Sequence, residues 1–88
     1  MKTKSNFALR QVAGTWVVLP LGAATAEVSG MITLNESGVM LWKLLEKGTT
    51  CQELADALVS EYEVTVEEAF NDANAFLEQL KKIHCIEE

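Results

Sequence analysis

The chain has 88 residues, enough for one domain with a modest core. Apolar residues make up 49% of it, which is typical of a folded globular protein and too high for disorder. The formal net charge of −6 argues against nucleic-acid binding, which normally depends on Lys and Arg at phosphates.

Membrane insertion and secretion are not indicated by the sequence. The longest apolar stretch, near Trp16, is broken by Pro20 and is far shorter than the roughly 20 residues that cross a bilayer. Lys2 is not followed by an apolar run long enough for a signal peptide, so we expect a cytoplasmic protein with no membrane partner. Cys51 and Cys85 lack metal-ligand spacing, and we expect both to be reduced thiols.

The first third of the chain predicts three short strands. They are the stretch with Phe7, Leu9 and Val12, then Trp16 to Leu19, then Met31 to Leu34. Gly14-Thr15 predicts a hairpin turn between the first two strands. The small-residue segment from Gly22 to Gly30 predicts a loop before the third.

The remainder of the chain predicts three helices with clear start signals. Asn35 fits the N-cap of the first, which ends at Gly48. Thr50-Cys51-Gln52-Glu53 and Thr65-Val66-Glu67-Glu68 each have the pattern of a capping box, which begins the second and third helices. The third helix is expected to run to about Ile83.

The third predicted helix has a wide apolar face made of two stripes. The first stripe contains Val66, Phe70, Ala73, Leu77 and Leu80, and the second contains Ala69, Phe76 and Ile83. Such a face can pack on a core on one side and contact something else on the other. If this helix lies beside the third strand, the second stripe would form the floor of a groove.

Three short antiparallel strands followed by three helices predict a single α+β domain over residues 1–88, similar to a winged helix-turn-helix. In a DNA-binding member of that class, the third helix would enter the major groove. From Gly48 to Leu80, however, there is no Lys or Arg, and there are eight carboxylates. We therefore expect no nucleic-acid partner.

No catalytic motif is recognisable. His84 stands next to Cys85 near the C-terminal end, but a catalytic pair normally converges in space from separate segments, so we expect an ordinary solvent-facing histidine. The acidic residues from Glu61 to Asp72 lack the pattern of a calcium loop, and no phosphate-binding glycine loop is present. We expect no enzymatic activity, no metal and no cofactor.

The third predicted strand could bind a peptide through its backbone. An edge strand presents unpaired amides and carbonyls that an extended guest chain can join. Met31, Ile32, Thr33 and Leu34 carry no charge that would oppose such pairing. The alternative is an ordinary edge covered by the preceding loop, and periodicity leaves both open. An open edge also allows two copies to pair as a homodimer.

The stretch Leu34-Asn35-Glu36-Ser37-Gly38, with Trp42 and Leu45, is the most specific of several motifs in this chain. Further matches follow at Gly48, Thr50, Glu53-Leu54, Leu58, Tyr62, Val64, Phe76-Leu77 and Leu80. Together they resemble the PqqD family over residues 30–86. The resemblance implies a recognition element for the leader of a ribosomally synthesised, post-translationally modified precursor peptide. It implies a leader that adds beside the third strand and delivery to a modifying enzyme, often a radical S-adenosylmethionine protein.

Carried onto this chain, the resemblance predicts that the peptide binds along Met31, Ile32, Thr33 and Leu34. It also predicts groove residues on the third helix at Phe70, Ala73, Asn74 and Leu77. The expected core residues are Trp42, Leu45, Leu54, Leu58 and Leu80.

The chain departs from the family pattern at three places. Gly38 replaces the usual Ala, His84 stands where a Gly usually follows the last helix, and the Gly22 to Gly30 loop is long.

The sequence is also compatible with two other functions. A winged-helix regulator or protein-interaction adaptor without a leader peptide fits the same fold, and so does a structural subunit of a larger complex. A neighbouring gene for a short peptide, together with one for a radical enzyme, would favour leader recognition. An isolated gene would favour the adaptor.

Overall fold

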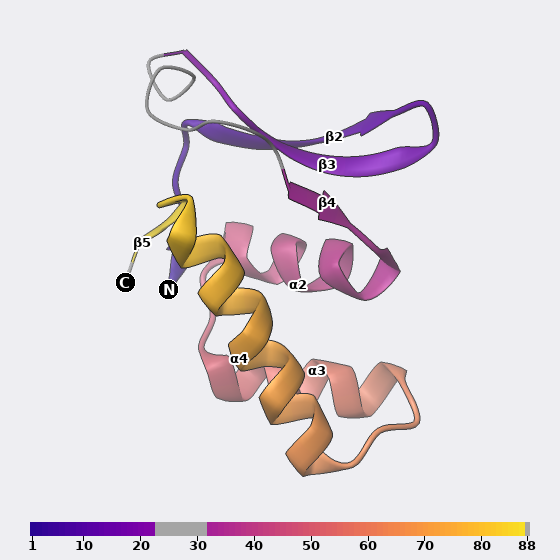
Figure 1. Ribbon diagram of the computed structural model, residues 1–88. Helices are drawn as coiled ribbons and strands as arrows, with labels where there is room; N and C mark the ends of the chain where they lie inside the picture. Colours follow the sequence, from indigo (N-terminus) through magenta and orange to yellow (C-terminus); the bar gives the residue numbers. More distant parts are fainter. Residues whose placement is uncertain (23–31, 88) are drawn as a thin grey trace.

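The computed structural model describes residues 1–22 and 32–87 of the chain. Within this described part, a small sheet lies on one side and three helices pack together on the other (Figure 1). In chain order the elements are β1 (Lys2–Thr3), β2 (Phe7–Val12), β3 (Thr15–Pro20), β4 (Ile32–Leu34), α2 (Glu36–Lys47), α3 (Cys51–Glu61), α4 (Val66–Lys82) and β5 (Ile86–Glu87). The predicted α+β architecture of three antiparallel strands followed by three helices is confirmed.

The main sheet has the strand order β2-β3-β4, with both pairs antiparallel. The β2–β3 hairpin closes at Ala13 and Gly14, whose φ angles are +51° and +81°. Positive φ at both central residues gives a turn whose twist matches that of the flanking strands. The predicted turn at Gly14-Thr15 was therefore one residue too late, because Thr15 already pairs with Val12.

β4 is the edge strand of this sheet. Its three residues pair with β3 through Trp16 opposite Leu34, Val17 opposite Thr33 and Val18 opposite Ile32. Alternation places the side chains of Ile32 and Leu34 on the helix-facing side, where both are buried, and the Thr33 side chain on the other side, where it is exposed. The predicted third strand is thus present over Ile32–Leu34. Met31 and the predicted loop after Gly22 lie outside the described residues.

A second, two-stranded sheet joins the two ends of the chain. β1 pairs antiparallel with β5, with Lys2 opposite Glu87 and Thr3 opposite Ile86. The amide of Lys4 donates to the carbonyl of Cys85 at 2.9 Å. Sequence reasoning missed this pairing because both strands have only two residues and are far apart in the chain.

The three helices begin at the residues that the sequence predicted. The Oδ1 atom of Asn35 accepts from the Gly38 amide at 2.9 Å, which caps α2. At α4 the capping box is complete: the Glu68 amide donates to Thr65 Oγ1 at 3.0 Å, and the Thr65 amide donates to the Glu68 carboxylate at 3.1 Å. Such side-chain bonds satisfy backbone donors that a helix start leaves unpaired.

The predicted capping box at α3 forms only in part. The Glu53 amide donates to Thr50 Oγ1 at 3.1 Å, as expected. The Glu53 carboxylate, however, accepts from the Thr50 hydroxyl at 3.3 Å and not from the Thr50 amide. Thr50 therefore caps α3 without the reciprocal bond.

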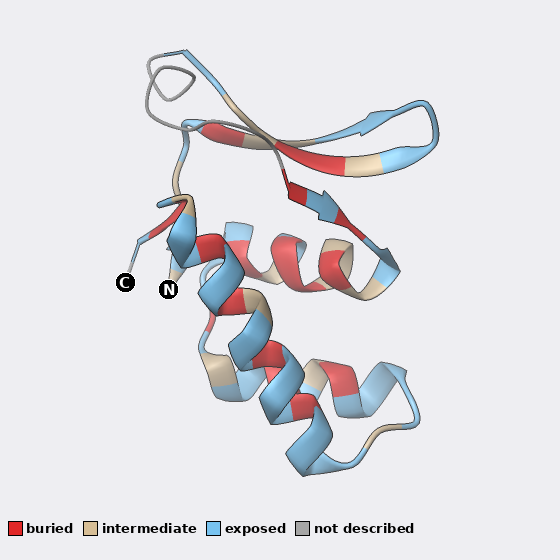
Figure 2. Ribbon diagram, viewed as in Figure 1, coloured by how far each residue is buried: buried red, intermediate tan, exposed pale blue. Residues whose placement is uncertain are grey.

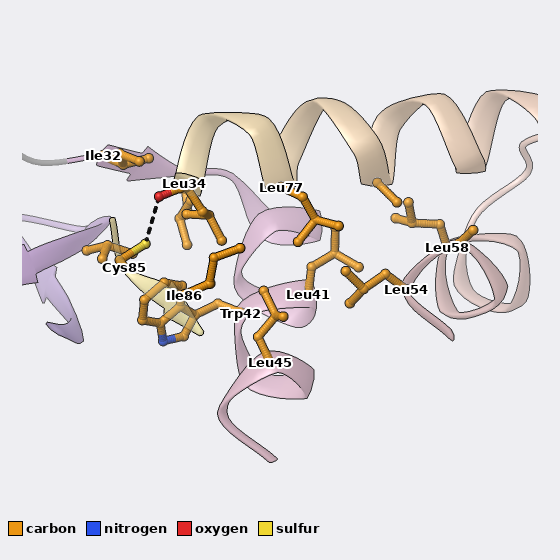
Figure 3. Close-up of a cluster of buried hydrophobic side chains, with 14 of the residues drawn as sticks. Ile32, Leu34, Leu41, Trp42, Leu45, Leu54, Leu58, Leu77, Cys85 and Ile86 are labelled. Atoms are coloured by element: carbon orange, nitrogen blue, oxygen red, sulfur yellow. Dashed lines mark hydrogen bonds between the residues drawn. The ribbon is translucent and has the colours of Figure 1, made fainter. Parts of the chain in front are cut away.

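The core lies partly between the sheet and α2 and partly among the three helices, where the buried faces meet (Figure 2). Figure 3 shows β4, α2, α3 and α4 contributing to it, with Cys85 and Ile86 beside Trp42. All five expected core residues are buried: Trp42, Leu45, Leu54, Leu58 and Leu80. Full burial of a large apolar side chain contributes about 1.5–3 kcal/mol to folding.

The inward face of α4 differs from the predicted first stripe. Its buried residues are Ala69, Ala73, Leu77 and Leu80. Val66 and Phe70 remain 65% and 39% exposed, so the first turns of α4 lie beyond the edge of the core. Across the described residues, no helix is long and apolar enough to cross a membrane.

Candidate functional site

A groove of about 580 Å³ lies where β4, the start of α2 and one flank of α4 meet. Its lining residues are Thr33, Leu34, Asn35, Ser37, Gly38, Leu41, Leu58, Asp72, Ala75, Phe76 and Gln79. The groove therefore runs beside the strand whose outer backbone has no strand partner among the described residues.

Four residues of α4 form one side of the groove. Asp72, Ala75, Phe76 and Gln79 are spaced by three, one and three residues, which places them on one helical face. Phe76 is half-buried and also packs against the core. The aromatic ring is thus held by the core while part of it remains available to a guest in the groove.

The floor of the groove is apolar. Leu34 from β4, Leu41 from α2 and Leu58 from α3 line it, and all three are buried. A floor of leucine side chains favours an apolar guest side chain, because its burial removes apolar surface from water. The groove can therefore hold at least one apolar anchor.

The start of α2 forms the end of the groove next to β4. Asn35 Oδ1 accepts from both the Gly38 amide and the Ser37 hydroxyl, each at 2.9 Å. A Cβ atom on Gly38 would lie 3.3 Å from Leu34 Cβ and from Asn35 Oδ1, which is tighter than ordinary packing. Glycine at this position thus lets the first turn of α2 lie directly against the end of β4.

Among the predicted site residues on β4, Thr33 and Leu34 line the groove. Ile32 is buried in the core on the same strand, and Met31 lies outside the described residues. Two of the three described positions of the predicted third strand therefore line the groove.

The four residues predicted on α4 do not line the groove. Ala73 and Leu77 are buried in the core. Phe70 is partly exposed on another part of the helix, and Asn74 Oδ1 accepts from the Cys51 thiol at 3.4 Å. Their contact with a peptide stays a prediction, and the groove geometry favours the flank with Phe76 instead. Phe76 belonged to the second predicted stripe, which is the sequence signal that pointed to this flank.

The groove carries one ionisable side chain among the described residues, that of Asp72. No Lys or Arg lines it, and none occurs between Gly48 and Leu80. The site is therefore acidic at one point and otherwise neutral.

The two cysteines are free thiols, as the sequence predicted. Cys85 is buried, its thiol donates to the Leu80 carbonyl at 3.4 Å, and burial raises its pKa to about 11 (Figure 3). A thiol with so high a pKa is protonated at neutral pH and is a poor nucleophile. His84 is exposed after the end of α4. Within residues 1–22 and 32–87, no group of three or more His, Cys, Asp or Glu side chains could hold a metal ion.

Comparison with known proteins gives one family and two similar solved structures. TbiB1 in complex with the TbiA(beta) leader peptide is 26% identical, with a TM-score of 0.78, and the match covers 99% of this chain and 95% of that one. Lasso peptide synthetase B1 complexed with the leader peptide is 25% identical, with a TM-score of 0.72, covering 92% and 89%. No curated protein matches the chain. The family model for coenzyme PQQ synthesis protein D (PqqD) matches residues 15–86, and the chain belongs to the PqqD family.

Proposed function

We propose that this chain binds the leader of a ribosomally synthesised precursor peptide and presents it to a peptide-modifying enzyme. In this proposal the leader adds as a strand along the outer side of β4. Its side chains on one face then enter the groove between β4 and α4. Main-chain hydrogen bonds supply affinity, and the groove selects side chains.

The observation that carries the proposal is the position of the groove. It adjoins the edge strand of the sheet, includes Thr33 and Leu34 from that strand, and has a floor of buried leucines. One extended peptide can therefore pair with the edge strand and place an apolar side chain in the groove.

The relatives support the same class of ligand. Both similar solved structures contain leader peptides bound to chains that this one matches along nearly its whole length. Membership of the PqqD family supports a role as a peptide-binding accessory protein rather than an enzyme. We propose a radical S-adenosylmethionine protein as the partner that modifies the bound peptide.

Calorimetric titration with the leader of a short peptide encoded beside this gene tests the proposal. The decisive variants are Ala75→Trp and Asn74→Trp. These neighbouring helix positions point about 100° apart, since a helix turns once in about 3.6 residues. Both side chains are exposed, so each variant is expected to fold.

We expect saturable one-to-one binding that Ala75→Trp abolishes by filling the groove and that Asn74→Trp leaves within about twofold, a difference of about 0.4 kcal/mol. Loss of binding in Asn74→Trp alone would place the peptide on the other flank of α4. Absence of binding at about 100 μM, a free energy near −5.5 kcal/mol, even with the neighbouring modifying enzyme added, would contradict the proposal.

A further inference from the structure

We infer that Asp72 determines peptide specificity: it selects peptides that carry Lys or Arg at the position facing it in the groove. This inference rests on the function proposed above and adds to it the chemistry of one ligand residue. It is carried by the charges of the groove and its surroundings.

The Asp72 carboxylate has no protein partner within the described residues. It takes part in no ion pair and no side-chain hydrogen bond there. The remaining lining residues are apolar or neutral, so nothing else in the groove would compensate its charge. If a guest strand covered this carboxylate without supplying a cation or a hydrogen-bond donor, the carboxylate would lose its hydration and gain no compensating interaction.

The nearest turn of α4 makes the surroundings more acidic. Glu68 precedes Asp72 by four residues, on the same helical face. The Thr65 amide and hydroxyl bind the Glu68 carboxylate in the capping box and lower its pKa, so it stays charged at neutral pH. Two like charges at this spacing repel each other, and an approaching cation relieves that repulsion.

The cations of the chain itself lie elsewhere. Lys43 of α2 sits over the ring of Trp16, with its Nζ 5.9 Å from the ring centroid, and it does not line the groove. Lys81 and Lys82 are in the last turn of α4, beyond the groove residue Gln79. The counter-charge for Asp72 is therefore expected from the ligand.

Asp72 stands one turn before Phe76 on the same face. A peptide that places an apolar side chain against Phe76 would thus present a neighbouring side chain to Asp72. Lys and Arg have long apolar stems that can cross the groove while their heads reach the carboxylate. The predicted recognition pattern is an apolar anchor with a basic residue a fixed distance from it.

Selection from a display library of random linear peptides, on the intact protein, tests this inference. The variants are Asp72→Asn and Asp72→Lys. Glu78→Gln is the matched control, because Glu78 is an exposed acid on α4 that does not line the groove. Circular dichroism confirms that each variant is folded before selection.

The wild type and Glu78→Gln are expected to enrich peptides with Lys or Arg at one fixed position. Asp72→Asn is expected to keep the apolar anchor and lose the basic preference, and Asp72→Lys is expected to select Asp or Glu there. For one selected peptide, Asp72→Asn should weaken binding about 3- to 5-fold. High salt should weaken binding to the wild type more than binding to Asp72→Asn, which keeps the other acidic residues of the surface.

Enrichment of groove-binding peptides without a basic position, or the same basic preference in Asp72→Asn, would overturn the inference while leaving peptide binding intact. Enrichment of no peptide by the wild type would overturn the proposed function and this inference together.

Discussion

Thr33 of β4 and Phe76 of α4 line the same groove, although α2 and α3 separate them in the chain. One residue belongs to the strand that a guest would join, and the other supplies the aromatic surface that the guest's side chain would contact. The fold thus brings a main-chain partner and a side-chain partner to one place. Peptide recognition by strand addition needs both.

Truncation of Phe76 should weaken peptide binding. Phe76→Ala removes the only aromatic side chain lining the groove among the described residues, and we expect a loss of about tenfold, near 1.4 kcal/mol. Phe70→Ala is the matched control, since Phe70 is a partly exposed phenylalanine of the same helix outside the groove. The affinity of the Phe70→Ala variant for the peptide should stay within about twofold of the wild type. Calorimetry with one leader peptide measures both. Equal losses would mean that the ring of Phe76 has no special role.

Trp42 should tolerate Phe much better than Ala. The indole is fully buried, and its Nε1–H has no hydrogen-bond partner within the described part of the chain. Trp42→Phe leaves a smaller cavity and also removes an unsatisfied donor, so we expect a loss of about 1–2 kcal/mol, against about 3–5 kcal/mol for Trp42→Ala. Urea denaturation gives both free energies of unfolding. Equal destabilisation by the two variants would contradict this expectation, since the larger cavity left by Trp42→Ala should cost more.

Replacement of His84 by Gly should stabilise the fold. His84 has a φ of +57°, a left-handed conformation that is costly for residues with a Cβ atom. We expect His84→Gly to raise the free energy of unfolding by about 0.5–1 kcal/mol and His84→Ala to give no such gain. Chemical denaturation compares the three proteins. A destabilised His84→Gly variant would mean that the imidazole makes a favourable contribution outweighing this strain.

The same φ angle accounts for the glycine that the family pattern has at this position, and it makes His84 a strained departure from that pattern. Glycine is the usual residue after the last helix of the family because it adopts this conformation without strain. Here the chain turns at the same point with histidine, and the turn leads directly into β5. The β1–β5 pairing beyond it helps to hold the turn in place.

Cys85 should make the fold sensitive to alkaline pH. Burial raises its pKa from 9.0 in a free thiol to about 11, so the folded state binds the thiol proton more tightly than the unfolded state does. This contribution to stability is fully present below about pH 9 and declines as the pH rises to about 11. Denaturation of Cys85→Ala and the wild type between these pH values measures the effect. An identical pH dependence of the two proteins would contradict it.

The sequence predicted best those features that depend on a few adjacent residues. Asn35, Thr50 and Thr65 start helices through bonds to amides three residues away, so each signal is local. The turn signal at Gly14-Thr15 was equally local, and it located the hairpin to within one residue. The third strand was a candidate site because an edge strand has unpaired backbone groups, and the family resemblance favoured peptide binding there over a covered edge.

The groove side of α4 could not be read from periodicity. Its apolar face is wide, and which part packs on α3 or faces the groove depends on how the helices cross, which is a non-local property. Ala73 was predicted in the groove and lies in the core. Ala75 and Gln79 line the groove, although neither belongs to an apolar stripe or to a motif of the sequence. The β1–β5 sheet was missed for the same reason, since it depends on the two ends of the chain meeting.

The central claim is that a leader peptide lies along β4, and residue-resolved amide hydrogen exchange of β4 tests it most directly. Exchange is measured by NMR with and without saturating leader peptide. We predict that the β4 amides directed away from β3 exchange more slowly in the complex, because a guest strand then binds them. Saturable binding with unchanged exchange throughout β4 would contradict strand addition at this edge.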